Sequence, residues 1–411
     1  MKRRDFLIAS VGTLGASAAV TCRADSAPCP APNVSLAAAP GVNKSMATPC
    51  EIAGSPAPKW LRGIPPFQWV ALPSLGNSSV IPNPPAPGMT GVRSVTDAWG
   101  GAALRQNGSY YILHGGGHGD YAGNEIYALQ LSLDAPQWTR IWGPTPNNAI
   151  VPNQYYYDDS PSSPASIHTY NSLVFNDQDD VFMRFMRGQY IGAHFIGGVD
   201  GIRWGGTAWE QNQTNNIWPA PPNPWKFVNG QCKDSDGNVY FVNGWNRLIW
   251  NRRTNLWSVP IRNSQYAVQS CGCCYDTKRH IIWSFGGGIS GGGRVGASQA
   301  YMWEITTGSE RLITLTGPNA SAIDGNNANS SSAIYDAVAD LVLVVTGDGE
   351  IYSFNPTTFA VTRVPTSGPS LPNTTSSSGS GPWGKLQYAS QLGGIVIQPT
   401  WKAATFFMRT H

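Results

Sequence analysis

The sequence predicts an all-β protein built from repeated small sheets, and its composition and its internal pattern both indicate that fold class. Charged residues make up only 12% of the 411 residues, whereas glycine and proline are abundant, with 46 and 32 copies. The chain also contains 16 tryptophans and 16 tyrosines. Turn formers and aromatic residues at this density are typical of many short strands joined by tight loops.

β-Rich segments recur along the chain in a fixed order. The clearest unit has Tyr110–Leu113, a glycine-rich loop, Glu125–Leu129 and then Gln137–Ile141. Similar units follow at 239–259, 281–315 and 341–364. A further short strand comes before each unit and ends in Asn176, Asp234, Asp276 or Asp336. A four-stranded sheet cannot bury both of its faces alone, so the units are expected to stack radially as the blades of a β-propeller.

We expect six blades, which begin near Asp97, His168, Gly230, Tyr266, Asn326 and Leu386. The last unit has no obvious fourth strand, and Phe67–Leu72 has the pattern of a fourth strand without partners. The N-terminal strand is therefore predicted to complete the C-terminal blade, because ring closure removes open sheet edges. Residues 188–225 fit the repeat poorly, and a seventh blade within them is the alternative.

The blades resemble those of kelch and galactose-oxidase-like propellers. The resemblance lies in glycine pairs after the second strand, an aromatic residue in the third and a tryptophan in the fourth, and it covers about residues 65–411. The glycine pairs are incomplete around Asn243-Gly244 and Thr346-Gly347. The resemblance implies one propeller domain over residues 65–411.

The N-terminus predicts export. Met1–Leu7 contains paired arginines before a hydrophobic stretch that continues to about Val20, and it resembles a twin-arginine signal. A membrane anchor is the alternative, although the stretch is short for a span. We expect a signal over residues 1–24, a Pro/Ala-rich extension over residues 25–64, a periplasmic or secreted location, and no stable membrane span in the mature chain.

The formal charge argues against a nucleic-acid partner. The first two dozen residues carry four basic residues and one acidic residue, so without them the formal charge falls from +3 to zero. No basic stripe suits a nucleic acid, and we expect a monomer.

An oxidising destination permits disulfides. Cys29 and Cys50 are one candidate pair, and near Cys271 either Cys273 bonds the adjacent Cys274 or Cys274 bonds Cys232.

Four of the six histidines, His114, His118, His168 and His194, fall within residues 114–194. In a propeller, the loops between second and third strands gather on one face with the segments that lead into first strands, and long loops there carry function. We therefore place a polar site on this face of the first two blades. Its predicted catalytic residues are His118, His168, Tyr170, Arg184 and Arg187. Its predicted substrate-binding residues are His114, Asp120, Tyr121, Asn124, Asn171, His194 and Arg294.

Three chemistries suit these residues. The first is β-elimination on a uronic-acid polysaccharide, with His118 or Tyr170 as base and acid, and with Arg184 or Arg187 on the substrate carboxylate unless they pair with Asp179 and Asp180. In residue types this site resembles that of propeller-fold ulvan lyases.

The second is a module that binds a glycan or a protein without catalysis, with tryptophans as stacking platforms. The third is metal binding, with Zn²⁺ or Cu²⁺ at His114 and His118, joined by Asp120 or His168, and with copper it would extend to a metal-dependent oxidase as a minor alternative. The copper family also needs a cross-linked tyrosine–cysteine pair, which we do not identify. The leading expectation is an exported carbohydrate-active lyase that acts on a poly- or oligosaccharide and needs no cofactor.

Overall fold

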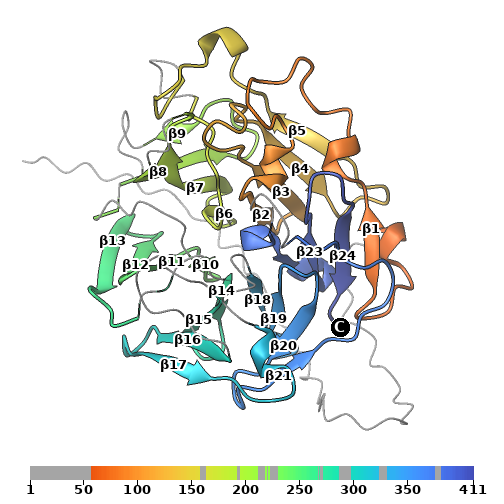
Figure 1. Cartoon of the computed structure of the whole chain (residues 1–411), viewed down its shortest axis with the longest axis vertical. Helices are drawn as coiled ribbons and strands as arrows, with labels where there is room; N and C mark the ends of the chain where they lie inside the picture. Colours follow the sequence, from red (N-terminus) through yellow and green to blue (C-terminus); the bar gives the residue numbers. More distant parts are fainter. Residues whose placement is uncertain are drawn as a thin grey trace, which may run out of the picture. The chain divides into compact units, whose positions relative to one another are not determined.

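Strands β1 to β24 form six antiparallel sheets of four strands each, arranged in a ring (Figure 1). The computed structural model describes residues 57–157, 163–191, 195–211, 218–219, 221–222, 230–266, 268, 272–286, 298–323, 331–374 and 381–411. The predicted signal and most of the predicted extension lie outside these ranges. Within them, no helix has both the length and the apolar character that a membrane crossing requires.

The strands follow the chain from blade to blade. Blade 1 holds β2 (Gly101–Arg105), β3 (Tyr110–His114), β4 (Ile126–Gln130) and β5 (Trp138–Trp142). Blade 2 holds β6 (Leu173–Asn176), β7 (Val181–Gly188), β8 (Phe195–Arg203) and β9 (Glu210–Gln211). Blade 3 holds β10 (Gly230–Lys233), β11 (Val239–Asn243), β12 (Asn246–Asn251) and β13 (Leu256–Ile261).

The second half of the ring has the same plan. Blade 4 holds β14 (Gly272–Asp276), β15 (Ile281–Phe285), β16 (Gln299–Glu304) and β17 (Glu310–Thr314). Blade 5 holds β18 (Ser332–Asp336), β19 (Leu341–Val345), β20 (Ile351–Phe354) and β21 (Val361–Arg363). Blade 6 holds β22 (Gln387–Ala389), β23 (Gly394–Ile397), β24 (Thr405–Arg409) and β1 (Trp69–Leu72). Helical turns are short: α1 (Ser94–Asp97), η1 (Lys59–Leu61), η2 (Leu75–Asn77), η3 (Asn147–Ala149), η4 (Ala320–Ala322), η5 (Trp383–Lys385) and η6 (Ser390–Leu392).

These sheets confirm the β-propeller, its six blades and its closure by the N-terminal strand. Strand β1 pairs antiparallel with β24, with Trp69 opposite Met408 and Leu72 opposite Thr405. The alternative of a seventh blade within residues 188–225 is wrong, because β8 and β9 in that segment complete blade 2. First strands lie nearest the centre of the ring (Figure 1).

The turn after the first strand of a blade is built by a side chain, as the recurring Asp and Asn predict. The carboxylate of Asp276 accepts hydrogen bonds from the backbone N–H groups of Lys278 and Arg279, both at 3.0 Å. Asp336 accepts in the same way from Val338 and Ala339. Such side-chain acceptors fix a turn that a backbone alone would leave open, so each first strand is followed directly by its second.

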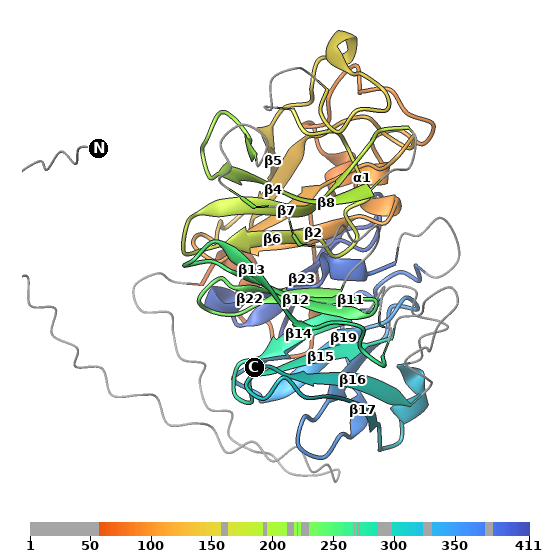
Figure 2. The same ribbon diagram turned by 90° about the vertical axis from the view of Figure 1, so that its left-hand side faces the viewer.

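The hydrophobic core lies between blades. Successive residues of a strand point to opposite faces of the sheet, so Tyr240 packs between blades 3 and 4 while Phe241 packs between blades 2 and 3. Trp250, Trp303 and Trp283 are fully buried, in the interfaces of blades 2 and 3, 3 and 4, and 4 and 5 respectively. The view from the side shows the stacked sheets edge-on (Figure 2). A separate small cluster on the described chain contains Ile167, Tyr170, Met186 and Trp383, with Trp99 packed against it.

Candidate functional site

This separate cluster is built on aromatic residues with a strained backbone. Trp99, Tyr170 and Trp383 have φ values of 48°, 44° and 35°. Bulky side chains avoid this left-handed region, at a cost of about 1–3 kcal/mol each, and such residues concentrate at functional sites. The three residues precede the first strands of blades 1, 2 and 6, so neighbouring blades bring them to the same end of the ring.

Contacts hold the three aromatic residues together. The Tyr170 N–H donates to the carbonyl of Trp99 over 2.6 Å. The Tyr170 ring lies 5.2 Å from the Trp383 ring and 6.3 Å from the Trp99 ring, measured between centroids. A Cβ on Gly101 would come within 2.0 Å of the Tyr170 carbonyl oxygen. A glycine at the start of β2 therefore lets the segment of Tyr170 pack directly on blade 1.

His168 lies at the centre of the polar part of the site. Its Nε2 lies 2.9 Å from Oδ2 of Asp120, and its Nδ1 lies 3.5 Å from the hydroxyl of Tyr170. Its ring packs 4.2 Å from the His118 ring and 4.6 Å from the Trp99 ring. The site thus combines residues of the loop between β3 and β4 with residues that lead into β6.

The contacts of His168 define its tautomer. An ionised carboxylate only accepts hydrogen bonds, so His168 Nε2 carries a hydrogen and donates it to Asp120. The pKa of His168 is lowered, chiefly by burial, although Asp120 opposes this shift. The ring is therefore neutral, and its Nδ1 lone pair faces the hydroxyl of Tyr170. Thr90 donates to the other oxygen of Asp120 over 2.8 Å, which holds the carboxylate in place.

The pKa shifts separate the roles that these groups can take. Burial, followed by the charge of the neighbouring His168, lowers the pKa of His118 to about 4, although Asp120 opposes this shift. Burial raises the pKa of Tyr170, and the charge of Asp120 acts in the same direction. The pKa of Asp120 is lowered, first by its hydrogen bond with His168. At neutral pH the site therefore holds a neutral imidazole, a protonated phenol and an ionised carboxylate.

Gly117 makes room for the His168 ring. A Cβ at position 117 would lie 1.7 Å from Cδ2 and 1.9 Å from Nε2 of His168. Gly117 also has φ of +87°, which side chains rarely adopt. The segment before blade 1 anchors the backbone of this loop, because the N–H groups of Thr90 and Gly91 both donate to the Asp120 carbonyl over 2.9 Å.

The side-chain contacts of His114 are with residues outside this polar cluster. Its side chain is fully buried, with Nδ1 3.0 Å from the Glu125 carbonyl and Nε2 3.4 Å from Nη1 of Arg184. Burial, followed by the charge of Arg184, lowers its pKa to about 3. A guanidinium beside Nε2 does not fit a metal ligand. Among the described residues, no group of three or more His, Cys, Asp or Glu is arranged to hold a metal ion.

Arg184 and Arg187 lie on strand β7 and not in a loop of the site. Both guanidinium groups pair with the buried carboxylate of Asp200, at 2.9 and 2.8 Å. The predicted partners Asp179 and Asp180 are wrong, because they pair with Arg252 and Arg105. We therefore assign these two arginines to the stability of blade 2.

The remaining predicted residues divide into three groups. Tyr121 and Asn124 are buried within blade 1, where the Tyr121 hydroxyl donates to Glu125 and the Asn124 amide donates to Thr145. Asn171 is half-buried beside Tyr170, and its amide donates to the Gln231 carbonyl over 3.3 Å. His194 and Arg294 lie outside the described residues.

Sequence reasoning missed several residues at or near the site. Trp99 and Trp383 form its aromatic wall, and no pattern of spacing separates them from the many core tryptophans. Thr90 holds Asp120, and it lies in the segment before the first blade, where no repeat was recognised. Asp200 lies in the poorly parsed segment 188–225. The only available signal was the position of Trp99 and Trp383 shortly before first strands.

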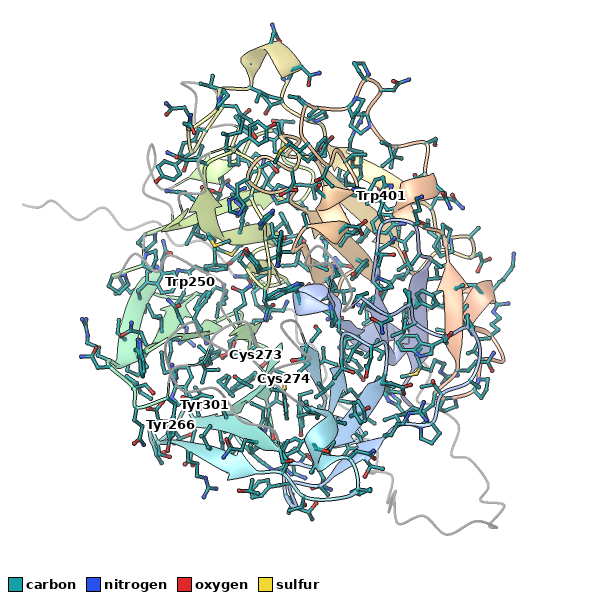
Figure 3. The ribbon with its side chains drawn as sticks, viewed as in Figure 1. Trp250, Tyr266, Cys273, Cys274, Tyr301 and Trp401 are labelled. Carbon is teal, nitrogen blue, oxygen red and sulfur yellow. The ribbon has the colours of Figure 1, made fainter. Side chains whose placement is uncertain are left out.

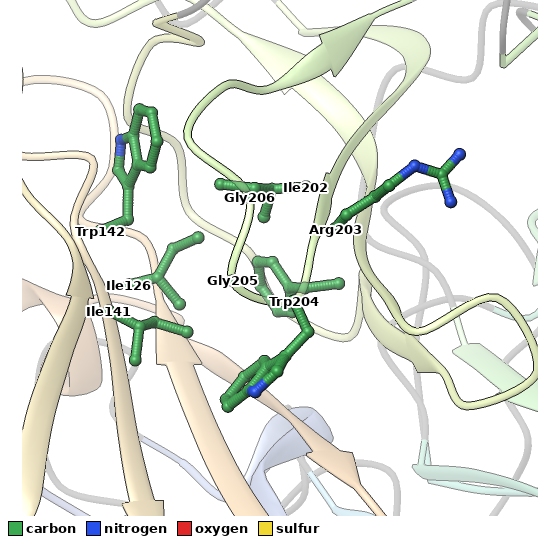
Figure 4. A pocket seen from close by; sticks show the side chains of 9 residues that line it. Ile126, Ile141, Trp142, Ile202, Arg203, Trp204, Gly205 and Gly206 are labelled. Atoms are coloured by element: carbon green, nitrogen blue, oxygen red, sulfur yellow. The ribbon is translucent and has the colours of Figure 1, made fainter.

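A pocket of about 240 Å³ lies elsewhere on blades 1 and 2 (Figure 4). It is lined by Ile126, Ile141, Trp142, Phe182, Ile202, Arg203, Trp204, Gly205 and Gly206. Arg203 is its one ionisable lining residue, and this side chain pairs with Glu210 over 2.8 Å. The pocket therefore has no acid–base pair, unlike the cluster of His118, His168 and Tyr170.

The chain is similar to known proteins in structure rather than in sequence. No protein-family model matches the chain, and no curated protein matches it. By structure, 771 solved chains match. One of them, described as "YCF48 bound to D1 peptide", is 11% identical, with a TM-score of 0.41 over 87% of this chain and 100% of that chain.

Proposed function

We propose that this chain is an exported carbohydrate-active propeller that cleaves uronic-acid-containing glycans by β-elimination at His118, His168 and Tyr170. The observation that carries the proposal is the double contact of His168, whose ring joins the Asp120 carboxylate to the Tyr170 hydroxyl beside a second imidazole. A neutral imidazole, a protonated phenol and an ionised carboxylate suit a reaction that moves one proton away from carbon and another onto oxygen.

His118 is proposed as the base. In β-elimination the base removes the proton from C5 of the uronate, the bond between C4 and its glycosidic oxygen breaks, and a C4=C5 double bond forms. His118 is neutral at pH 7 and partly exposed, so it can accept that proton. Its edge contact with His168 holds the ring in one orientation.

Tyr170 is proposed as the acid. Its hydroxyl stays protonated at neutral pH, and it can deliver that proton to the departing glycosidic oxygen. His168 then acts as a positioning residue, because its Nδ1 accepts from the hydroxyl while Asp120 fixes the opposite nitrogen. The half-buried Asn171 amide is the proposed donor to the substrate carboxylate, in place of the two arginines that Asp200 occupies.

The proposal is tested with the purified full chain on a panel of uronic-acid glycans, by following the ultraviolet absorbance of the unsaturated product. We expect His118→Ala and Tyr170→Phe each to lower the rate by ~10²-fold or more. The matched control is His280→Asn. His280 has φ of 55°, which asparagine tolerates, and it contacts Tyr275 in the turn after β14.

The pH profile gives a second readout. Because His118 must be neutral to act as base, activity should fall as the pH drops toward the His118 pKa of about 4. If no glycan on the panel gives an unsaturated product, catalysis by this site is refuted. Retention of the chain on an immobilised glycan would then support the alternative of a binding propeller, in which the nearly buried His168 and Tyr170 only shape the surface.

A further inference from the structure

We propose that Cys232 and Cys273 are a disulfide site that joins blades 3 and 4 across the inner rim of the ring. The Sγ atoms of these two residues lie 3.6 Å apart, on first strands of neighbouring blades. The site does not involve the histidine cluster, so it stands independently of the proposed reaction.

The alternation of side chains along β14 selects Cys273 over its neighbour. Cys273 faces blade 3 and belongs to the cluster that contains Tyr240, whereas Cys274 faces blade 5 and packs with Trp283. Figure 3 labels both cysteines on the inner strand of blade 4. Because Cys274 faces away from blade 3, this geometry argues against the predicted bond between Cys274 and Cys232. A bond between Cys273 and Cys274 would need two side chains that point to opposite faces.

The surroundings of the pair suit exchange chemistry. Cys232 is half-buried, so an external disulfide can reach it, while Cys273 is 5% exposed and lies behind it. The hydroxyl of Ser284 donates to Sγ of Cys273 over 3.7 Å. Burial raises the pKa of the Cys274 thiol well above its usual value, so Cys274 stays protonated and unreactive beside Cys273.

The reaction is thiol–disulfide exchange with a disulfide oxidant such as oxidised glutathione. The Cys232 thiolate attacks one sulfur of the oxidant, which forms a mixed disulfide and releases one glutathione thiolate. The Cys273 thiolate then attacks Cys232 Sγ, forms the bond between the blades and releases the second glutathione. The protein loses two electrons and two protons, and the oxidant gains both as two thiols.

The consequence is a ring braced at one interface. Cys232 and Cys273 are separated by 41 positions, so the bond closes a long loop and restricts the unfolded chain. Blades 3 and 4 also contact through stacked Tyr240 and Tyr275, whose ring centroids lie 5.2 Å apart. Reduction should loosen this interface before the others.

The test uses the full chain, equilibrated with glutathione of oxidising composition, alkylated without reduction, digested and analysed by mass spectrometry. We expect a peptide pair linked through Cys232 and Cys273, with Cys274 alkylated only after unfolding. Wild type and the matched control Cys274→Ser should melt several degrees lower when reduced, and Cys273→Ser should show no such dependence on reductant. Alkylated Cys232, or Cys232 linked to Cys271 or Cys274, would overturn the proposal. If Cys273→Ser does not fold, the wild-type digest still decides.

Discussion

At the scale of single residues, the site depends on a glycine as much as on its histidines. The loop around Gly117 passes so close to His168 that the imidazole occupies the space of a side chain. Position 117 therefore sets where the ring can lie, and through the ring it sets the distances to Asp120 and Tyr170.

Gly117→Ala should displace His168 from Asp120 and lower the proposed lyase activity by ~10²-fold or more, the contribution of a positioned acid–base group. Thermal unfolding and glycan cleavage measured side by side would check this. The control is Gly63→Ala, because Gly63 has a similar φ of +75° but nothing within 4 Å of the added methyl group. It carries the same backbone strain without the clash. Equal loss of activity in both variants would show that strain alone is responsible.

The residue types predicted part of this site, but they did not show which of the predicted residues are buried. The concentration of histidines in residues 114–194 led to His118 and His168, which the structure places side by side. The same reasoning selected His114, yet that residue ends β3 and points into the protein. Four positions along the loop separate a buried histidine from a partly exposed one, and no residue pattern marks the boundary.

At the scale of elements, a bulge in the β7–β8 hairpin organises blade 2. Arg184 lies directly opposite Asp200, and the register shifts between Arg184 and Met186. Residues three apart on a regular strand point to opposite faces, but the extra residue of the bulge brings Arg187 to the side of Arg184. One buried carboxylate thus serves two arginines, and Tyr156 donates to it as well.

Asp200→Asn should destabilise the protein by about 3–5 kcal/mol, because it leaves two buried guanidinium groups without an opposing charge. Equilibrium unfolding in urea measures the change. As a control, Glu350→Gln weakens a pair with Arg363 in which both side chains are exposed, at 38% and 59%, and it should cost less than about 1 kcal/mol. Comparable losses in the two variants would contradict the role assigned to Asp200.

The strands of the ring were predictable because each short turn carries its own signal, such as Asp276 after β14. Blade 2 was harder to read, since its β7–β8 hairpin is long and the partner of its arginines comes 16 and 13 residues later. A contact that depends on a bulge follows no regular spacing in the sequence, so the repeat pattern could not predict it. Asp179 and Asp180, which are near in sequence, were for that reason the wrong choice.

At the scale of the whole molecule, the ring is held closed by a strand from the other end of the chain. The Trp69 N–H donates to Ser367 in the neighbouring blade. Because N–H directions alternate along a strand, the Val70 N–H faces β24 and the Ala71 N–H faces away from it. This closure was predictable, because Phe67–Leu72 had the pattern of a strand and the last blade lacked one.

Val70→Pro should therefore weaken the closure, while Ala71→Pro should be tolerated, since proline is accepted where its missing N–H has no partner strand. Hydrogen exchange followed by mass spectrometry would locate the effect. We expect faster exchange in Gln387–Arg409 for Val70→Pro, with the strands of blades 3 and 4 unchanged. Identical exchange in the two variants would contradict closure by β1.

The pairing of β1 with β24 also sets the order of events during synthesis. Strand β1 cannot pair with β24 until Arg409 has left the ribosome, so until then the nascent chain is an open arc whose sixth sheet is incomplete. An arc of this kind exposes apolar edges that chaperones recognise. If export follows the twin-arginine route, which carries folded chains, transport must wait for this last pairing step.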